Sequence, residues 1–381
     1  MRSMLRIPCS ARSGRSQPQV CKAAAPQDPL LLRTARGEEV ERTPVWLMRQ
    51  AGRYMAAFRE FSDKYPFRMR SETAEIAVEL SLQPYKAFQT DGVIFFSDIL
   101  TPLPAMGIEF DVIKGKGPLI SNPVRSLEHV KALRVLDDPA SSLPFIQTTL
   151  STLRSEIDNE ATLIGFIGTP WTLAAYSVEG KSDKECRQTK MMMFSAPAVL
   201  HSLLEHLTES LITYAGYQIE SGAQILMLFD SWAHHLSPEQ FAEFSMPYSE
   251  RIVKALQAKY PGVPVIFHAN GGTGKLDLIK HTAANVVGLD WATNMAVARD
   301  TLGPNVIVQG NVDPMLLFAP ENVIVEAVQR NLIQAGSRGH ILNVGHGVPQ
   351  GTPEQNVALF CEQARQSGKL FARQRELVGS K

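Results

Sequence analysis

Short apolar runs recur along the chain, and each is bounded by polar residues, glycine or proline. Eight of them are rich in β-branched or aromatic residues and have the length of buried strands. The predicted strands are Val45–Met48, Val93–Phe96, Leu163–Ile167, Gln224–Phe229, Val263–Phe267, Val286–Leu289, Val306–Val308 and Ile341–Val344. Runs that are apolar throughout are typical of parallel sheets covered on both faces.

Most of these runs are separated by longer stretches in which apolar residues recur at helical spacing. Predicted helices cover Ser71–Phe88, with a capped start, Pro197–Glu220, a segment opening at Ser237-Pro238-Glu239, Pro320–Ala335 and Thr352–Gln366. This alternation predicts an α/β protein with a single (β/α)8 TIM barrel. A doubly wound open sheet is the alternative, but no GxGxxG sequence follows the first predicted strand, which weakens it.

A barrel of this kind places its catalytic groups at the carboxyl ends of the strands. Seven of the eight predicted ends carry an acid, a base or a hydrogen-bonding side chain beyond a threonine. The ends read Arg49, Ser97-Asp98, Gly168-Thr169-Pro170, Asp230-Ser231, His268-Ala269-Asn270, Asp290-Trp291, Gln309-Gly310-Asn311 and Gly345-His346-Gly347. A single polar strand end would mean little, but polar residues at seven ends that meet at the same side of the barrel indicate a functional site.

The first of these ends is the most informative. Residues 44–54 read Pro-Val-Trp-Leu-Met-Arg-Gln-Ala-Gly-Arg-Tyr, so a buried strand runs into Arg49 and Arg53. Gly52 allows the backbone to turn and to approach a ligand closely. Guanidinium groups hold carboxylates with two parallel hydrogen bonds. An isolated pair of arginines would indicate only a surface loop; with the other polar ends, the pair favours an anion-binding site.

Charge and composition narrow the function further. The 381 residues are 44% hydrophobic and 20% charged, as in an ordinary globular protein. The formal net charge is zero, but residues 1–27 contain five basic residues and no acid. Without them, 33 basic residues face 38 acidic ones, a net charge of −5. With no basic tract and no nucleic-acid motif, the sequence argues against nucleic-acid binding.

The N-terminal segment has the composition of a targeting peptide. Residues 1–27 combine arginine with serine, alanine and proline and lack a secretory apolar core, which predicts a chloroplast transit peptide rather than a mitochondrial one. An N-terminal tail with no targeting role is the alternative. Residues 28–381 would then form the barrel.

The cysteines and the apolar stretches argue against a disulfide-rich, a zinc-binding and a membrane-spanning protein. Only Cys186 and Cys361 lie outside the N-terminal segment, so neither a disulfide framework nor a cysteine zinc site is predicted. The longest uncharged stretch, Ala161–Val178, contains Pro170 and predicts strand, turn and helix rather than a membrane span.

Five motifs, taken in order, carry a family resemblance over residues 30 to about 365. They are residues 44–54, Phe-Ser-Asp-Ile-Leu at 96–100, Gly-Thr-Pro-Trp-Thr-Leu-Ala-Ala-Tyr-Ser-Val-Glu-Gly at 168–180, Phe-Asp-Ser-Trp at 229–232 and Asn-Val-Gly-His-Gly at 343–347. The chain resembles the uroporphyrinogen decarboxylases of haem and chlorophyll biosynthesis. The resemblance implies a homodimer that needs no cofactor or metal. It also implies a tetrapyrrole substrate with eight carboxylates, whose four acetate arms lose CO2.

The resemblance also implies residue roles. Asp98 would accept hydrogen bonds from the pyrrole N–H groups and stabilise the protonated ring; the alternative is an aspartate that caps the next helix. Arg49 and Arg53 would bind carboxylates, and Arg49 is a candidate proton donor. Gln50, Ala51 and Gly52 would contact the substrate mainly through their backbone.

Three more residues complete the implied site. The Tyr176 hydroxyl would pair with a carboxylate; the alternative is a core tyrosine whose hydroxyl is hydrogen-bonded within the protein. Ser231 would donate to a propionate; the alternative is a helix cap before Pro238. His346, between two glycines, would be a carboxylate partner or proton shuttle. His234 and His235 are interpreted as rim residues, and Arg68 as a further carboxylate contact.

Two other functions compete with this one. A corrinoid-linked methyltransferase shares the barrel but binds zinc, and no cysteine lies near His268 in the sequence. A non-enzymatic tetrapyrrole carrier would need the arginines but not Asp98.

Overall fold

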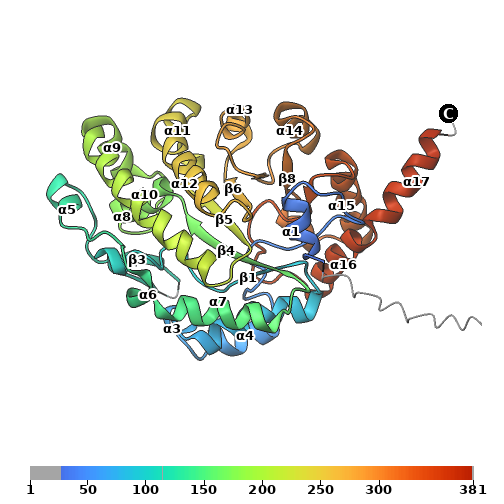
Figure 1. Cartoon of the computed structure of the whole chain (residues 1–381), viewed down its shortest axis with the longest axis horizontal. Coiled ribbons are helices and arrows are strands. Elements are labelled where there is room, and N and C mark those ends of the chain that lie inside the picture. Colours follow the sequence, from blue (N-terminus) through green and yellow to red (C-terminus); the bar gives the residue numbers. More distant parts are fainter. Residues whose placement is uncertain (1–26, 114, 380–381) are drawn as a thin grey trace, which may run out of the picture.

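The computed structural model describes residues 27–113 and 115–379, so nearly all of the predicted transit peptide lies outside the described residues. Seven parallel strands form one curved sheet in the order β1-β4-β5-β6-β7-β8-β9 (Figure 1). They are β1 Gly92–Ile94, β4 Thr162–Gly168, β5 Ile225–Asp230, β6 Val265–Ala269, β7 Val286–Gly288, β8 Ile307–Gln309 and β9 His340–Ile341. The prediction of a parallel α/β architecture is therefore confirmed.

Helices alternate with the strands and lie outside the sheet (Figure 1). The α-helices are α1 Leu30–Ala35, α2 Ala56–Ser62, α3 Phe67–Glu72, α4 Ala74–Phe88, α5 Leu127–Lys131, α6 Pro139–Ser142, α7 Pro144–Glu156, α8 Pro170–Glu179, α9 Arg187–Ser195, α10 Pro197–Glu220, α11 Pro238–Phe244, α12 Met246–Lys259, α13 Leu276–Ile279, α14 Met295–Leu302, α15 Glu321–Ala335, α16 Glu354–Arg365 and α17 Ser367–Gly379. Short 3-10 helices are η1 Pro104–Met106, η2 Ala233–His235, η3 Thr273–Lys275 and η4 Pro314–Phe318.

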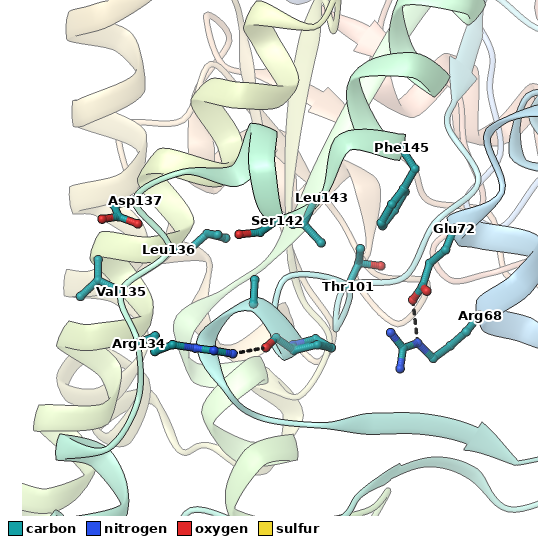
Figure 2. A pocket seen from close by; sticks show the side chains of 12 residues that line it. Arg68, Glu72, Thr101, Arg134, Val135, Leu136, Asp137, Ser142, Leu143 and Phe145 are labelled. Atoms are coloured by element: carbon teal, nitrogen blue, oxygen red, sulfur yellow. Dashed lines mark hydrogen bonds and ion pairs between the residues drawn. The ribbon is translucent and has the colours of Figure 1, made fainter.

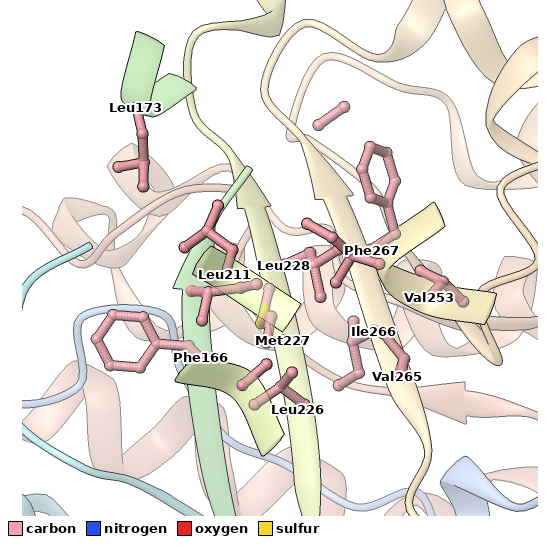
Figure 3. Packing of buried hydrophobic residues seen from close by; sticks show 14 of the residues in the cluster. Phe166, Leu173, Leu211, Leu226, Met227, Leu228, Val253, Val265, Ile266 and Phe267 are labelled. Atoms are coloured by element: carbon pink, nitrogen blue, oxygen red, sulfur yellow. The ribbon is translucent and has the colours of Figure 1, made fainter. Parts of the chain in front are cut away.

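The central strands are apolar on both faces, as a covered parallel sheet requires. Figure 3 shows residues of β4, β5 and β6 packed together with side chains such as Leu211 of α10 and Val253 of α12. On the inner face, Met227 places its sulfur 4.0 Å from the Gln309 amide nitrogen. The Trp46 indole N–H donates to the other side of that amide at 2.8 Å, so the interior contains a satisfied polar pair.

The predicted strand Val45–Met48 is wrong in extent, because only Val45 pairs, as a single parallel bridge to Leu342. The backbone N–H of Leu47 donates to the Gln50 side chain, and that of Met48 to the Asn343 side chain. These side-chain acceptors take the place of ladder partners. Seven strands and this bridge stand where eight strands were predicted.

Helix boundaries follow local sequence signals with one exception. Helix α10 has the predicted bounds, and Ser237 and Gln240 form a capping box at α11. The predicted helix Ser71–Phe88 is instead divided at Thr73, whose backbone is extended, and Ser71 lies inside α3. An antiparallel hairpin of β2 Phe110–Ile113 and β3 Gly117–Ile120, which was not predicted, follows β1.

The Asp91 carboxylate connects the bridge segment to the sheet. It accepts from the Val45 N–H at 2.8 Å and from both Arg42 guanidinium nitrogens at 2.7 and 2.8 Å. We expect Asp91→Asn to lower the free energy of unfolding by about 1.5–3 kcal/mol, because a charge-assisted set of bonds is lost. Urea denaturation measures this. The control Asp277→Asn, at an aspartate whose side chain is 81% exposed, should change stability by less than about 0.5 kcal/mol. Equal stability of the two variants would contradict the role of Asp91.

Candidate active site

A row of aromatic side chains crosses the inner face near the carboxyl ends of the strands. The ring centroids lie 5.0 Å apart for Phe95 and Phe166, 5.7 Å for Phe166 and Phe229, and 6.2 Å for Phe229 and His268. These contacts close the interior below the polar strand ends. The row is therefore an aromatic layer beneath the polar strand ends.

Arg49 is exposed and has a left-handed backbone, with φ of 55°. A residue other than glycine rarely adopts this conformation, and it costs of order 1 kcal/mol. The turn is held because the Val348 N–H donates to the Met48 carbonyl at 3.0 Å. The Arg49 side chain then passes Gly347 so closely that a Cβ there would lie 2.3 Å from Arg49 Cδ. The fold thus directs this guanidinium towards the loop that carries His346.

Asp98 lies in the loop after β1 and is partly shielded from solvent. Its Oδ1 accepts from the Leu100 N–H at 2.8 Å, and its own N–H donates to the Thr101 hydroxyl. No hydrogen bond from the described residues reaches Oδ2. Burial raises the pKa of Asp98, and the Leu100 N–H and the Arg49 charge oppose that rise. One oxygen therefore stabilises the local turn, while the other is available to a ligand. The alternative, a cap on the next helix, is wrong, because the N-cap of η1 is Leu103.

Tyr176 and Ser231 come from neighbouring segments. Tyr176, on α8, packs against Trp232 with ring centroids 4.5 Å apart and the ring planes tilted by 50°, and within the described residues its hydroxyl makes no hydrogen bond. The hydroxyl of Ser231 is likewise unpaired there, although its carbonyl accepts from Asn270. Ser237, and not Ser231, caps α11. Both hydroxyls are therefore free to bind a ligand.

Two histidines lie on neighbouring parts of the same surface. His268 is buried and its Nδ1 lies 3.1 Å from the Gly288 carbonyl; burial lowers its pKa to about 4. His346 is half-buried, and desolvation, then Arg49 and His234, lower its pKa. His346 is thus close enough to Arg49 and His234 to experience their charges. A neutral ring that gains a proton only in acid is therefore expected at His268, and the pKa of His346 is shifted in the same direction.

The other residues of the first motif differ in exposure. Gln50 is fully buried: its side chain donates to the Gly92 carbonyl, its N–H to the Leu47 carbonyl, and its own carbonyl accepts from the Tyr54 hydroxyl, so no part of it is exposed to a ligand. Ala51 and Gly52 are partly exposed, and Arg53 is exposed. Arg53 also lowers the pKa of Arg70 after the larger effect of burial, which places the two cations near each other.

Arg68 and Arg70 lie in different environments. Arg68 pairs with Glu72 at 2.6 Å and lines a separate cavity of about 430 Å³ together with residues such as Thr101 and Phe145 (Figure 2). Arg70 is buried and lies 5.4–5.8 Å from the rings of three phenylalanines, Phe58, Phe67 and Phe96. Among the arginines of residues 58–70 the sequence favoured Arg68, and only the tertiary structure shows that Arg70 is the one surrounded by phenylalanine rings.

At several strand ends the polar side chain is hydrogen-bonded to neighbouring loops and is not left for a ligand. Buried Asp230 accepts from the hydroxyls of Thr172 and Ser245, at 2.8 and 2.5 Å. Asp290 accepts from the backbone N–H groups of Gly272 and Thr293. These carboxylates hold neighbouring loops in place and have little capacity left for substrate. The described part of the chain contains no group of three or more His, Cys, Asp or Glu side chains able to hold a metal ion, and no helix there is long and apolar enough to cross a membrane.

Gly347 offers a test of the Arg49 geometry. Alanine there would force the Arg49 side chain into another rotamer, because its Cβ would clash with Cδ, Cγ and Cβ of the arginine. We expect Gly347→Ala to lower kcat/KM for the decarboxylation implied by the sequence resemblance by about 10- to 100-fold. The control Gly274→Ala adds a Cβ that meets nothing within 4 Å and should keep full activity. Steady-state kinetics and a melting curve compare both variants with the unmodified protein. A fully active Gly347→Ala would show that Arg49 does not need this position.

Comparison with known proteins gives the family. The family model "Uroporphyrinogen decarboxylase (URO-D)" matches residues 26–367. Uroporphyrinogen decarboxylase of a Picosynechococcus strain is 53% identical over 88% of this chain and 95% of its own length, and that of a Synechocystis strain is 51% identical over 90% and 98%. A methyltransferase from Methanosarcina mazei aligns with a TM-score of 0.75 at 18% identity, over 89% of this chain and 99% of its own, which shows similarity of fold alone. On the extent and identity of these matches, the chain belongs to the uroporphyrinogen decarboxylase family.

Proposed function

We propose that this protein removes CO2 from the four acetate side chains of uroporphyrinogen III, leaving methyl groups and giving coproporphyrinogen III. Family membership supports the reaction, and the available Oδ2 of Asp98 beside Arg49 is the observation that carries it at the site. The low-identity likeness to a methyltransferase gives no comparable support for the corrinoid alternative.

In each step a CH2–COO⁻ arm and one proton become CH3 and CO2. Breaking the C–C bond leaves an electron pair that needs an acceptor. A pyrrole ring protonated at carbon accepts that pair, and a second proton transfer completes the methyl group while the ring proton is returned. The chain's residues must therefore bind a polyanion, stabilise a ring cation and move protons.

Asp98 is suited to stabilise the ring. Its carboxylate can accept from inward-pointing pyrrole N–H groups and attract the positive charge of the protonated pyrrole. Because burial raises the pKa of Asp98, the carboxylate is lost at a higher pH than for an exposed aspartate, and activity should fall on the acid side accordingly.

The arginines and hydroxyls would bind the carboxylates. Arg49 and Arg53 provide exposed guanidinium groups, and Arg49 is the candidate proton donor. Tyr176 and Ser231 offer hydroxyls that no described residue occupies. His346 would pair with a carboxylate or relay a proton next to Arg49.

We also propose that segment 44–46 acts as the eighth strand of a closed barrel. It bonds to β9 through Leu342 and to the start of β1 through Asp91. A homodimer and import into the chloroplast complete the proposal, on the resemblance and on the composition of residues 1–27.

The reaction is tested by incubating the purified protein with uroporphyrinogen III without oxygen. Chromatography of the oxidised products counts the carboxylates. A product with four carboxylates, formed after prolonged dialysis against a chelator, is the expected result. No loss of carboxylates would refute the proposed reaction. Light scattering should give about twice the mass of one chain.

Asp98→Asn should slow the chemical step more than it weakens binding. Asparagine still accepts from a pyrrole N–H but has no charge to stabilise the ring cation. Loss of one such interaction costs about 3–4 kcal/mol, or about 10²–10³ in rate. Single-turnover rates and substrate affinity are measured side by side. A near-normal rate with weak affinity would assign Asp98 to binding only.

Arg49→Lys and Arg53→Lys should both reduce kcat/KM, because an ammonium cannot reproduce the planar fork. A lost charge-assisted contact costs about 1.5–3 kcal/mol. Turnover should fall more for Arg49→Lys, because that residue is also the proposed proton donor. Substrates with eight, seven, six and five carboxylates are compared; a defect that varies along the series indicates contact with acetates. Unchanged kinetics in folded variants would remove both arginines from the site.

Targeting is tested separately. The full chain fused to a fluorescent protein should enter chloroplasts of a plant or algal cell, whereas a chain starting at Asp28 should remain in the cytosol and keep its activity. Cytosolic retention of the full chain would contradict the transit peptide.

A further inference from the structure

His234 lies at the carboxyl end of the sheet, next to the proposed site, and the mechanism above gives it no role. It belongs to η2 in the loop after β5, and the loop after β6 lies beside it because these strands are neighbours. The Asn270 N–H donates to the Asp230 carbonyl at 3.1 Å, which fixes the start of the second loop against the end of β5.

The Asn270 side chain fixes the protonation of the His234 ring. Its amide nitrogen lies 3.2 Å from the Ser231 carbonyl and 3.2 Å from His234 Nδ1. An amide nitrogen carries two hydrogens, so it can donate one to each acceptor. With Asn270 as the donor in this contact, His234 Nδ1 is unprotonated and the neutral ring carries its hydrogen on Nε2. Asn270 thereby leaves an Nε2–H donor on the side of the ring away from the loop.

The surroundings keep the ring neutral and in place. Gly271 packs so closely that a Cβ there would lie 2.6 Å from His234 Cβ. Partial desolvation, the largest effect, lowers the pKa of His234; the Ser231 backbone opposes this shift, and the buried Lys275, which donates to the Gly271 carbonyl, adds to it. The ring centroid of His235 lies 4.1 Å from that of His234, and His346 is also close enough to interact with His234.

The position of His234 suits it to a polyanionic substrate. His234 is exposed, it lies three residues from Ser231, and its ring influences His346, which in turn interacts with Arg49. No described residue accepts a hydrogen bond from its Nε2. A neutral donor adds a directed contact for a carboxylate without placing a further positive charge beside Arg49.

This inference rests on the proposed function. We propose that His234, oriented by Asn270, donates its Nε2–H to a carboxylate of the tetrapyrrole and is a further specificity-determining residue. Asn270 acts through His234 and is therefore a positioning residue. The contact is made with a part of the substrate that does not react in that step, so it contributes to binding rather than to the chemical step.

Kinetics of four variants test the pair. His234→Phe keeps the ring shape without a donor and should raise KM for uroporphyrinogen about 10-fold, with kcat within about twofold. His234→Gln, whose amide nitrogen replaces Nε2, should restore KM to within about threefold. Asn270→Ala should raise KM, and the double variant Asn270→Ala/His234→Phe should be no worse than His234→Phe alone. His281→Phe, at an exposed histidine, is the control.

A second measurement does not depend on turnover. Nitrogen-15 spectra of labelled histidine in the full protein, with His234 assigned by its variant, should show the Nε2–H form, and the signal should change in Asn270→Ala. An Nδ1–H ring, donating to the Ser231 carbonyl instead, would overturn the proposal. So would a normal KM in a folded His234→Phe while the unmodified protein decarboxylates its substrate. Absence of decarboxylation by the unmodified protein would instead refute the proposed function, and this inference with it.

Discussion

The backbone between Pro44 and Met48 lies between the two edges of the parallel sheet, and the site depends on the hydrogen bonds made there. Leu342 of the last strand exchanges bonds with Pro44 and Trp46 on one side. Asp91 receives the Val45 N–H on the other side and donates its own N–H to the Val45 carbonyl. A sheet edge otherwise leaves these groups unpaired. Because the segment is held at both sides, the left-handed turn that follows it brings Arg49 to a fixed place.

The polar residues at the carboxyl ends of the strands fall into two groups, and residue type alone does not tell which group a residue belongs to. One group forms hydrogen bonds with neighbouring loops and contains Asp230, Asp290 and Asn311. Asn311, for example, donates to two backbone carbonyls and accepts from Asn331. Asp98 keeps one oxygen to which no residue that the structure describes donates a hydrogen bond. The first group provides a rigid support, and rigid support is what a catalytic group needs for accurate placement.

The electrostatics of the site balance one carboxylate against cations and neutral rings. Burial raises the pKa of Asp98, and Arg49 opposes this rise while it also lowers the pKa of His346. His268 has a pKa of about 4 because it is fully buried. Positive charge is therefore concentrated on the arginines, and the buried His268 offers a neutral ring.

The sequence by itself determined the alternation of strands and helices, the bounds of α10 and the residues Arg49 and Asp98, because hydrophobic periodicity, proline and short motifs are local signals. Only the tertiary structure decided which partners these residues meet. The Met48 N–H is taken by Asn343, 295 residues away, which shortens the first predicted strand. Asn270 reaches His234 only because β5 and β6 are neighbours. Hydrogen-bond partners distant in the chain follow from sheet order and packing, which no local pattern contains.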